Sequence, residues 1–336
     1  MHQKRSLVCF LGAGFSYAAG VPLARDLFES PYVLALSDQR ERRFRQVIDA
    51  YQVRKHQSPM LHAEEFLGEI YERHLRQKTP MWSWAVEYIC AVIASAGTPP
   101  PSMNRNPRYS NRINRPSIRP AHQAFWQTIL DRFDSVAVVT TNYDILIEQG
   151  LRHRPMKRPP SPGCFYGGLP RPQLLKGAAQ PFSAWSPDRE IEMTGAIPVY
   201  KLHGSLSWSL SGEKITAYQD LRSAFRNRGD AAIIPPIPDK EIPVWLRPIW
   251  EGAHTALSES DVWVICGYSV PAYDVSVRNL LEDSSATGAR RIIVLSPEAD
   301  QICGRLADVT SNAEFFPLPG LPCRPDQFGA VLDAPS

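Results

Sequence analysis

Short apolar runs with the length and composition of buried strands are the feature that most constrains how this chain can fold. Five of them occur along the sequence, at residues 6–10, 136–139, 197–200, 261–266 and 291–295. Segments with the spacing of apolar residues that is typical of helices separate most of these runs. Strands that alternate with helices predict an α/β fold with a mostly parallel sheet and right-handed crossovers.

The chain has 336 residues, enough to bury a large core, and we expect one large α/β domain with a helical insert. Residues 62–71 place apolar side chains at helical spacing, and residues 80–96 predict a second, more buried helix. Residues 97–120 are rich in Pro, Asn and Arg and predict an exposed, flexible loop. The predicted organisation is a main domain and an insert, formed by residues 1–30 with 121–336 and by residues 31–120.

Other elements follow from the same patterns. The first strand, its glycine turn and the helix that the turn opens are expected to extend to about Glu29. Further helices are predicted at residues 121–132, 244–258 and 274–284, with a final helix from about residue 300. Two segments are predicted to be irregular, namely residues 150–188 and the stretch between His203 and residue 231.

Composition excludes several classes of protein. Lys and Arg total 37 against 34 Asp and Glu, so the overall charge does not indicate a protein that binds nucleic acid. The longest apolar candidate, residues 84–96, contains Glu87 and is shorter than the roughly 20 residues that cross a bilayer. The N-terminus lacks the pattern of an export signal, so we expect a cytoplasmic protein without a membrane contact. The six cysteines have no Cys-x-x-Cys spacing, which predicts that no structural zinc is bound.

Two loops contain basic residues without acidic ones. Most such loops are merely solvated, and contact with nucleic acid or an acidic partner is the minority interpretation. The basic residues are Arg105, Arg108, Arg112, Arg115, Arg119, Arg152, Arg154, Lys157 and Arg158.

A glycine turn follows the first strand. Gly12 and Gly14 would let a phosphate approach the backbone, and the start of the next helix would supply N–H donors. The alternative is a glycine that simply turns the chain, and the full dinucleotide fingerprint is missing.

Polar residues follow two further strands. Asn142 and Asp144 come after the strand at 136–139, and His203 comes after the strand at 197–200. Singly, each has an ordinary structural explanation as a turn residue, a helix cap or a hydrogen-bonded histidine. Together, at the carboxyl ends of parallel strands, they predict a ligand site in which His203 serves as a general base.

A fourth strand ends in Gly267, Tyr268 and Ser269. A glycine and a hydroxyl at a strand end suit a contact with a phosphate or an adenosine. Asp274 follows at the expected start of a helix, where an N-cap is its ordinary role.

In their order along the chain these motifs resemble the sirtuin-like family, and most closely the sirtuin-like domains of bacterial anti-phage defence. The matching segments are residues 12–16 with 20–22, 140–144, 201–205, 234–236, and 267–269 with Pro271 and Asp274. The resemblance implies a Rossmann-like domain with a smaller second module and NAD as the ligand. It places Asn142 and His203 at the nicotinamide ribose as catalytic residues. It also implies nucleotide contacts from Gly12, Ala13, Gly14, Ser16, Thr141, Asp144, Gly204, Gly267 and Ser269.

The chain departs from deacylating sirtuins at two places. Those enzymes continue Gly-Ile-Pro with Asp-Phe-Arg, whereas here Pro22 is followed by Leu23, Ala24 and Arg25. They also carry a four-cysteine zinc module after the histidine, which this sequence does not have. Both departures weaken the case for peptide deacylation and leave the glycosidic chemistry intact.

The sequence therefore predicts an NAD glycohydrolase that releases nicotinamide and ADP-ribose, acting as an NAD-depleting effector of anti-phage defence. The alternatives are an NAD-dependent deacylase or ADP-ribosyltransferase, and a non-catalytic nucleotide-sensing subunit of a complex. Because an unrestrained NAD hydrolase would be toxic, we expect a homo-oligomer or a partner protein that triggers activity.

Overall fold

The computed structural model describes most of the chain. The described residues are 6–30, 37–95, 120–152, 164–169, 196–218, 230–237, 241–288, 291–311, 313–320 and 325–333. The predicted flexible loop at 97–120 lies outside them except for residue 120, and so do the basic residues of both loops apart from the backbone of Arg152.

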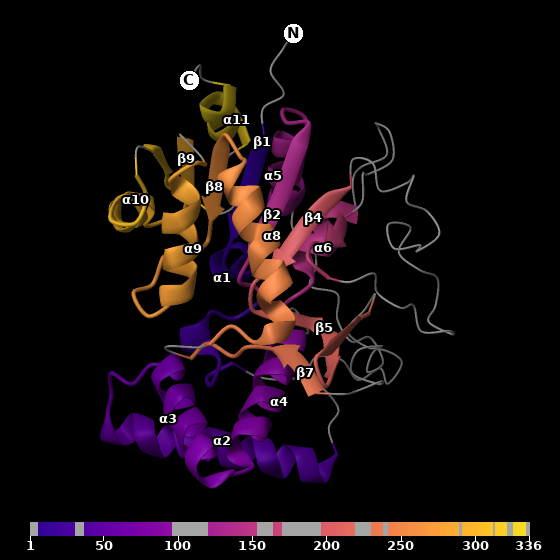
Figure 1. The fold of residues 1–336 in the computed structure, drawn as a ribbon. Helices are drawn as coiled ribbons and strands as arrows, with labels where there is room; N and C mark the ends of the chain where they lie inside the picture. Colours follow the sequence, from indigo (N-terminus) through magenta and orange to yellow (C-terminus); the bar gives the residue numbers. More distant parts are fainter. Residues whose placement is uncertain are drawn as a thin grey trace, which may run out of the picture.

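A seven-stranded sheet forms the centre of the molecule, in the order β10-β9-β8-β1-β2-β4-β3 (Figure 1). Every neighbouring pair in it is parallel. This confirms the predicted α/β class, since parallel strands need covered faces and read as continuous apolar runs. The strands are β1 Ser6–Leu11, β2 Ser135–Thr140, β3 Cys164–Tyr166, β4 Ile197–Lys201, β8 Val262–Cys266, β9 Arg291–Leu295 and β10 Glu314–Leu318.

Helices cover the sheet and bury its side chains. The pair α8 and α9 packs side by side on the face that is turned to the viewer in Figure 1. The side chains of all five residues of β8 are buried, and Cys9 and Cys266 lie fully buried in β1 and β8, as predicted. The helices are α5 Pro120–Leu130, α6 Leu146–Arg152, α8 Arg247–Ser258, α9 Val275–Ser285, α10 Ala299–Ala307 and α11 Pro325–Asp333.

Three helices build a second hydrophobic core at the carboxyl end of the sheet (Figure 1). They are α2 Asp38–Gln57, α3 Ala63–Gln77 and α4 Met81–Ala94, and most of α4 is buried, as predicted. Rings from each of them meet around Phe28, which stacks on Tyr51 at 4.5 Å and on Tyr88 at 5.5 Å. Ile145 and Ile233, from outside these helices, belong to the same core. The division of the chain at residues 30 and 120 stays a prediction.

The segment after His203 is a sheet, and the prediction of an irregular region there is wrong. Strands β5 Gly204–Ser211, β6 Lys214–Ala217 and β7 Asp230–Ile233 pair in the antiparallel order β6-β5-β7. In β5, Leu206, Trp208 and Leu210 alternate with serines, which is the period-two pattern of a strand. Gly212, with φ of +60°, closes the hairpin to β6.

Three smaller predictions also need correction. The segment 150–188, predicted to be irregular, contains strand β3. The helix at residue 300 is not the last element, because β10 and α11 follow α10. The helix after the glycine turn, α1 Ala13–Tyr17, is only five residues long and is followed by the short 3-10 turn η1 Ala24–Asp26. Another 3-10 turn, η5 Val244–Leu246, leads into α8.

No helix in the described ranges is long and apolar enough to cross a membrane.

Candidate active site at the carboxyl edge of the sheet

The four motifs singled out from the sequence follow four neighbouring strands. Gly267 follows β8, Gly12 follows β1, Asn142 follows β2 and His203 follows β4, and these strands are adjacent in the sheet order. Because the strands are parallel, all four motifs lie at the same edge, which in Figure 1 faces the helices α2–α4. In the sheet, β2 lies on one side of β1 and β8 lies on the other, so the order of the strands reverses at β1. Open α/β sheets bind ligands at such a reversal of strand order.

The glycine turn packs against the loop after β8, backbone to backbone. The N–H of Gly12 donates to the carbonyl oxygen of Cys266 at 3.0 Å, and the N–H of Gly14 donates to that of Gly267 at 2.9 Å. A Cβ atom on Gly12 would lie 2.5 Å from the Gly267 oxygen, closer than real Cβ contacts. The glycines are therefore required for this packing, and a phosphate contact at the turn stays a prediction.

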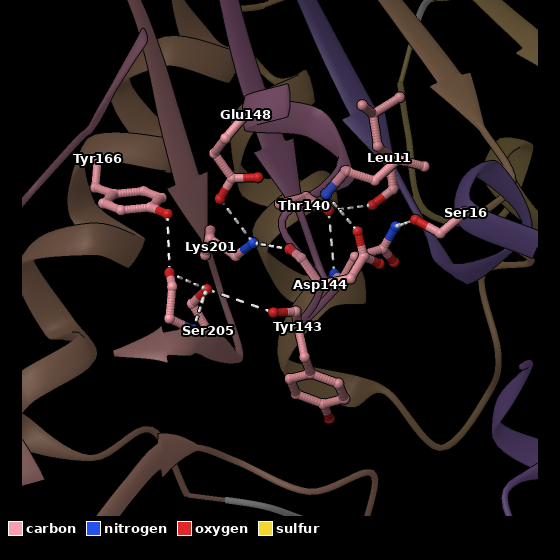
Figure 2. Close-up of polar contacts among 12 residues, drawn as sticks. Leu11, Ser16, Thr140, Tyr143, Asp144, Glu148, Tyr166, Lys201 and Ser205 are labelled. Atoms are coloured by element: carbon pink, nitrogen blue, oxygen red, sulfur yellow. Dashed lines mark hydrogen bonds and ion pairs between the residues drawn. The ribbon is translucent and has the colours of Figure 1, made fainter. Parts of the chain in front are cut away.

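Asn142 connects the end of β2 to that turn. Its Nδ2 donates to the carbonyl oxygen of Gly12 at 2.9 Å and to the Ser16 hydroxyl at 3.0 Å. Its backbone N–H donates to Thr140 Oγ1, which itself donates to the carbonyl oxygen of Leu11. The residue is 5% exposed, so Asn142 is buried at the end of the strand. Two hydrogen bonds therefore fix the side-chain amide and a third fixes the backbone; Figure 2 shows Ser16, Thr140 and Leu11, which take part in this network.

Asp144 caps helix α6, which is one of the two roles expected for it. Its Oδ1 accepts from the N–H of Leu146 at 2.8 Å, and the residue is 4% exposed. Burial raises the pKa of this carboxyl, while Lys201, the Leu146 N–H and the Ser16 hydroxyl act to lower it. Ser16 thus contacts both Asn142 and Asp144 and joins the two polar residues of the β2 end.

A buried ion pair stabilises the loop that contains Asp144, and it was not predicted from the sequence. The Lys201 ammonium donates to Glu148 Oε1 at 3.0 Å and contacts the carbonyl oxygen of Asp144 (Figure 2). Lys201 is 0% exposed and Glu148 is 3% exposed. The Ser205 hydroxyl extends the polar network by donating to the carbonyl oxygen of Tyr143. Lys201, two positions before His203, was the one hint of this ion pair in the sequence. Its partner Glu148 lies in helix α6, far from Lys201 along the chain.

His203 lies beside a carboxylate from the loop after β8. Its Nε2 is 3.9 Å from Oδ1 of Asp274, and both side chains are 5% exposed. The Tyr268 hydroxyl donates to the other oxygen of that carboxylate at 3.0 Å. Rings of Tyr143 and Trp250 lie 6.3 Å and 6.4 Å from the imidazole, centroid to centroid. The site thus brings a buried histidine and a buried carboxylate together.

The contact between Asp274 and the histidine was not predicted from the sequence. Asp274 does stand before helix α9, but its side chain makes no cap hydrogen bond to that helix. The carboxylate is directed to Tyr268 and His203 instead. The interpretation as an ordinary N-cap is therefore wrong for the side chain.

The remaining predicted nucleotide contacts differ in accessibility. Ala13, Gly14 and Thr141 are partly exposed and Ser269 is exposed, whereas Gly204 is buried. Gly204 has φ of +80°, and a Cβ there would lie 2.0 Å from the Ala232 oxygen, so the turn after His203 requires glycine. The roles of these residues toward a nucleotide stay predictions.

An open pocket of about 550 Å³ adjoins the histidine end of the site. Trp250 belongs to its wall, and the same ring faces His203. The lining residues are Glu241, Ile242, Arg247, Trp250, Glu251 and Ser276. Across the part of the chain that the structure describes, no group of three or more His, Cys, Asp or Glu side chains is arranged to hold a metal ion.

Comparison with known proteins gives one family and a set of structures. The family model of the SIR2-like domain matches residues 136–313, more than half of the 336-residue chain. A structure of Sir2 enzymes is 17% identical with a TM-score of 0.42, over 98% of this chain and 90% of that chain. A Sir2 homolog–NAD complex is 15% identical with a TM-score of 0.43, over 98% and 88%. A mutant Sir2 homologue in complex with 2′-O-acetyl ADP ribose is 14% identical with a TM-score of 0.45, over 98% and 91%. A search of curated proteins finds no match.

Proposed function

The chain belongs to the SIR2-like family, and from this membership we propose that it is an NAD glycohydrolase, which cleaves NAD to nicotinamide and ADP-ribose. The observation that supports the proposal is the placement of Asn142 and His203, both buried, at the ends of neighbouring parallel strands, with Asn142 hydrogen-bonded to the glycine turn. An immobile amide and an imidazole at one edge of the sheet are what cleavage of an N-glycosidic bond requires of a protein.

The reaction needs positioning more than acid catalysis. Cleavage passes through an oxocarbenium-like ribosyl centre, and nicotinamide departs as a neutral molecule. A water or ribose hydroxyl must then be held in place and lose a proton. His203 accepts that proton, and Asn142 fixes the water or the ribose through the amide that Gly12 and Ser16 hold.

We propose that NAD lies along this edge of the sheet. Ala13, Gly14 and Ser16 would face the diphosphate, and Gly267 and Ser269 the adenosine half. Thr141, Asp144 and Gly204 would line the ribose end. Gly12, Gly204 and Gly267 also support the site indirectly, because a Cβ at each would clash with neighbouring backbone and displace the loops that form the site.

Incubation of the purified protein with NAD alone tests the proposal. We expect nicotinamide and free ADP-ribose in equal amounts without any acceptor. His203→Ala and Asn142→Ala should each lower the rate by about 100-fold or more, the usual scale for a placed proton acceptor. The matched control is His254→Ala, since His254 is an exposed histidine on α8.

Three results would contradict hydrolysis. Turnover that requires an acylated peptide would indicate a deacylase, and ADP-ribose attached to a protein acceptor would indicate a transferase. Binding of NAD without turnover would indicate a nucleotide sensor.

We further propose that the activity depletes NAD in bacterial anti-phage defence and is restrained until a partner or self-assembly triggers it. The support is the family resemblance together with the toxicity that unrestrained NAD hydrolysis would cause. Expression in a bacterial host should protect against phage and lower cellular NAD on infection, and the His203→Ala variant should do neither. A monomer with full turnover and no partner would contradict the restraint.

A further inference from the structure

We propose that Asp274 is a positioning residue for His203, whose carboxylate holds the imidazole in the orientation and tautomer needed for a general base. This inference rests on the proposed function, because it assigns the group that prepares the proposed base. The distance of 3.9 Å between Nε2 of His203 and Oδ1 of Asp274 is within ion-pair range and longer than a hydrogen bond. Such contacts commonly tighten only when substrate is bound.

The carboxylate is itself held in place. The Tyr268 hydroxyl donates to Asp274 Oδ2 at 3.0 Å, and the Tyr268 ring packs on Phe10 of β1 with centroids 4.9 Å apart. The backbone N–H of Asp274 donates to the carbonyl oxygen of Pro271 at 3.2 Å. One oxygen of Asp274 is thus fixed by Tyr268 and the other is directed to His203.

The loop that carries Asp274 has an unusual backbone. Val270 has φ of +51°, although it is β-branched and fully buried, and Gly267 before it has φ of +67°. A left-handed conformation at valine is costly and persists where the surroundings enforce it, most often at functional sites. The Arg305 guanidinium fixes the loop from outside by donating to the carbonyl oxygen of Ser269 at 2.6 Å. The strained loop brings Asp274 to the histidine.

The pairing determines which nitrogen is basic. A proton on Nε2 that faces the Asp274 carboxylate leaves Nδ1 as the basic nitrogen of the neutral imidazole. In the reaction the water oxygen bonds to the ribosyl carbon as the glycosidic electrons leave with nicotinamide, and the water proton moves to Nδ1. The resulting imidazolium lies beside the Asp274 carboxyl group, which would stabilise the positive charge.

The other elements around the imidazole contribute aromatic groups. Tyr143 comes from the loop after β2, Trp250 from α8, and Tyr268 lies behind Asp274. Further out, Tyr273 donates to the Glu64 carboxylate on α3 at 3.0 Å. Burial keeps the pKa of Tyr143 and Tyr268 well above the ordinary value, so both are neutral at pH 7. Among the residues that the structure describes, Asp274 therefore supplies the carboxyl group beside the histidine, whereas Glu64 is bonded to Tyr273.

The test is the titration of the His203 imidazole, followed by NMR in protein with labelled histidine and assigned with His203→Ala. In the wild type, Asp274 should offset the effect of burial, so that the midpoint lies at or above that of an ordinary histidine. Asp274→Asn should lower the proton affinity of His203 at least tenfold. Asp283→Asn, which removes an exposed carboxylate from the same helix, should leave it unchanged.

Kinetics give the second readout. Asp274→Asn should lower kcat for NAD cleavage at least tenfold with little change in KM, and the acidic limb of its pH–rate profile should move to lower pH. Asp274→Glu keeps the carboxyl group, so it should restore part of kcat and part of the shift in the acidic limb.

The outcomes separate the two proposals. A His203 midpoint well below that of an ordinary histidine in the wild type, or one that Asp274→Asn does not change, overturns the positioning role whatever the NAD activity. The wild-type measurement decides the matter even if the Asn variant does not fold. A protein that shows the expected midpoints but releases no nicotinamide supports the pair and contradicts the proposed glycohydrolase.

Discussion

The side-chain amide of Asn142 donates a hydrogen bond of 2.9 Å to the carbonyl oxygen of Gly12, so the end of β2 is joined directly to the turn after β1. The same nitrogen donates to Ser16 in helix α1. A residue that we propose to act on NAD therefore also holds the loops of its own site together.

Replacement of Asn142 by Ala should lower both activity and stability. The rate should fall by about 100-fold or more, and the free energy of unfolding by about 1–3 kcal/mol, because buried partners lose their hydrogen bonds. Nicotinamide release and urea unfolding of the same preparations measure the two effects. Asn279→Ala, at an exposed position on α9, should change neither. Full stability in Asn142→Ala would show that the bonds to Gly12 and Ser16 are energetically unimportant.

Replacement of Gly12 by Ala should destabilise the fold and not merely weaken binding. The new methyl group would lie 2.5 Å from the Gly267 oxygen and 2.6 Å from the Tyr268 Cα, so the two loops must separate. Forced overpacking of this kind costs about 1–3 kcal/mol. Ser269→Ala changes an exposed side chain and should leave the melting temperature unaltered while it weakens NAD binding. Equal melting temperatures for the two variants would contradict this interpretation of the turn.

Replacement of Lys201 by Met should be among the most destabilising single changes in this region. It leaves the Glu148 carboxylate buried without its cation, and such loss of one partner costs about 3–5 kcal/mol. Adding Glu148→Gln should recover part of the loss. Denaturant unfolding of the two single variants and the double variant gives the coupling energy between the residues. Additive losses would show that the pair does not stabilise the loop.

Stability should decline in alkaline solution because of buried tyrosines. Burial, and then Glu148, holds the pKa of Tyr166 well above its ordinary value. Unfolded tyrosines ionise near pH 10 whereas folded Tyr166 keeps its proton, so the folded state binds more protons there. Its contribution is fully present below about pH 10 and is lost as the pH rises further.

Denaturant unfolding between about pH 9 and pH 11 measures this decline. Tyr166→Phe should make the slope of unfolding free energy against pH shallower, and Tyr17→Phe, at an exposed tyrosine, should not. An unchanged slope in Tyr166→Phe would contradict the assignment of the effect to this residue.

Local patterns were sufficient to predict most of the large sheet. The apolar runs that become β1, β2, β4, β8 and β9 are continuous because each strand is covered on both faces, and this pattern is visible without knowledge of any partner. The strand ends at Gly12, Asn142, His203 and Gly267 were predictable for the same reason. In β5, single apolar residues separated by serines form a weaker pattern than a continuous apolar run, and this strand pairs with β7, which is distant in the sequence.

The sequence by itself determined five of the seven strands of the large sheet and the polar residues that follow them, since hydrophobic periodicity and strand length are local properties. Only the tertiary structure decided which of those residues meet. The sheet order places β8 beside β1, and this brings Gly267 against Gly12 and Gly14. The left-handed backbone at Val270, in the loop after β8, places Asp274 next to His203. Lys201 of β4 pairs with Glu148 of α6. These contacts depend on how distant segments pack, which no local pattern of residues encodes.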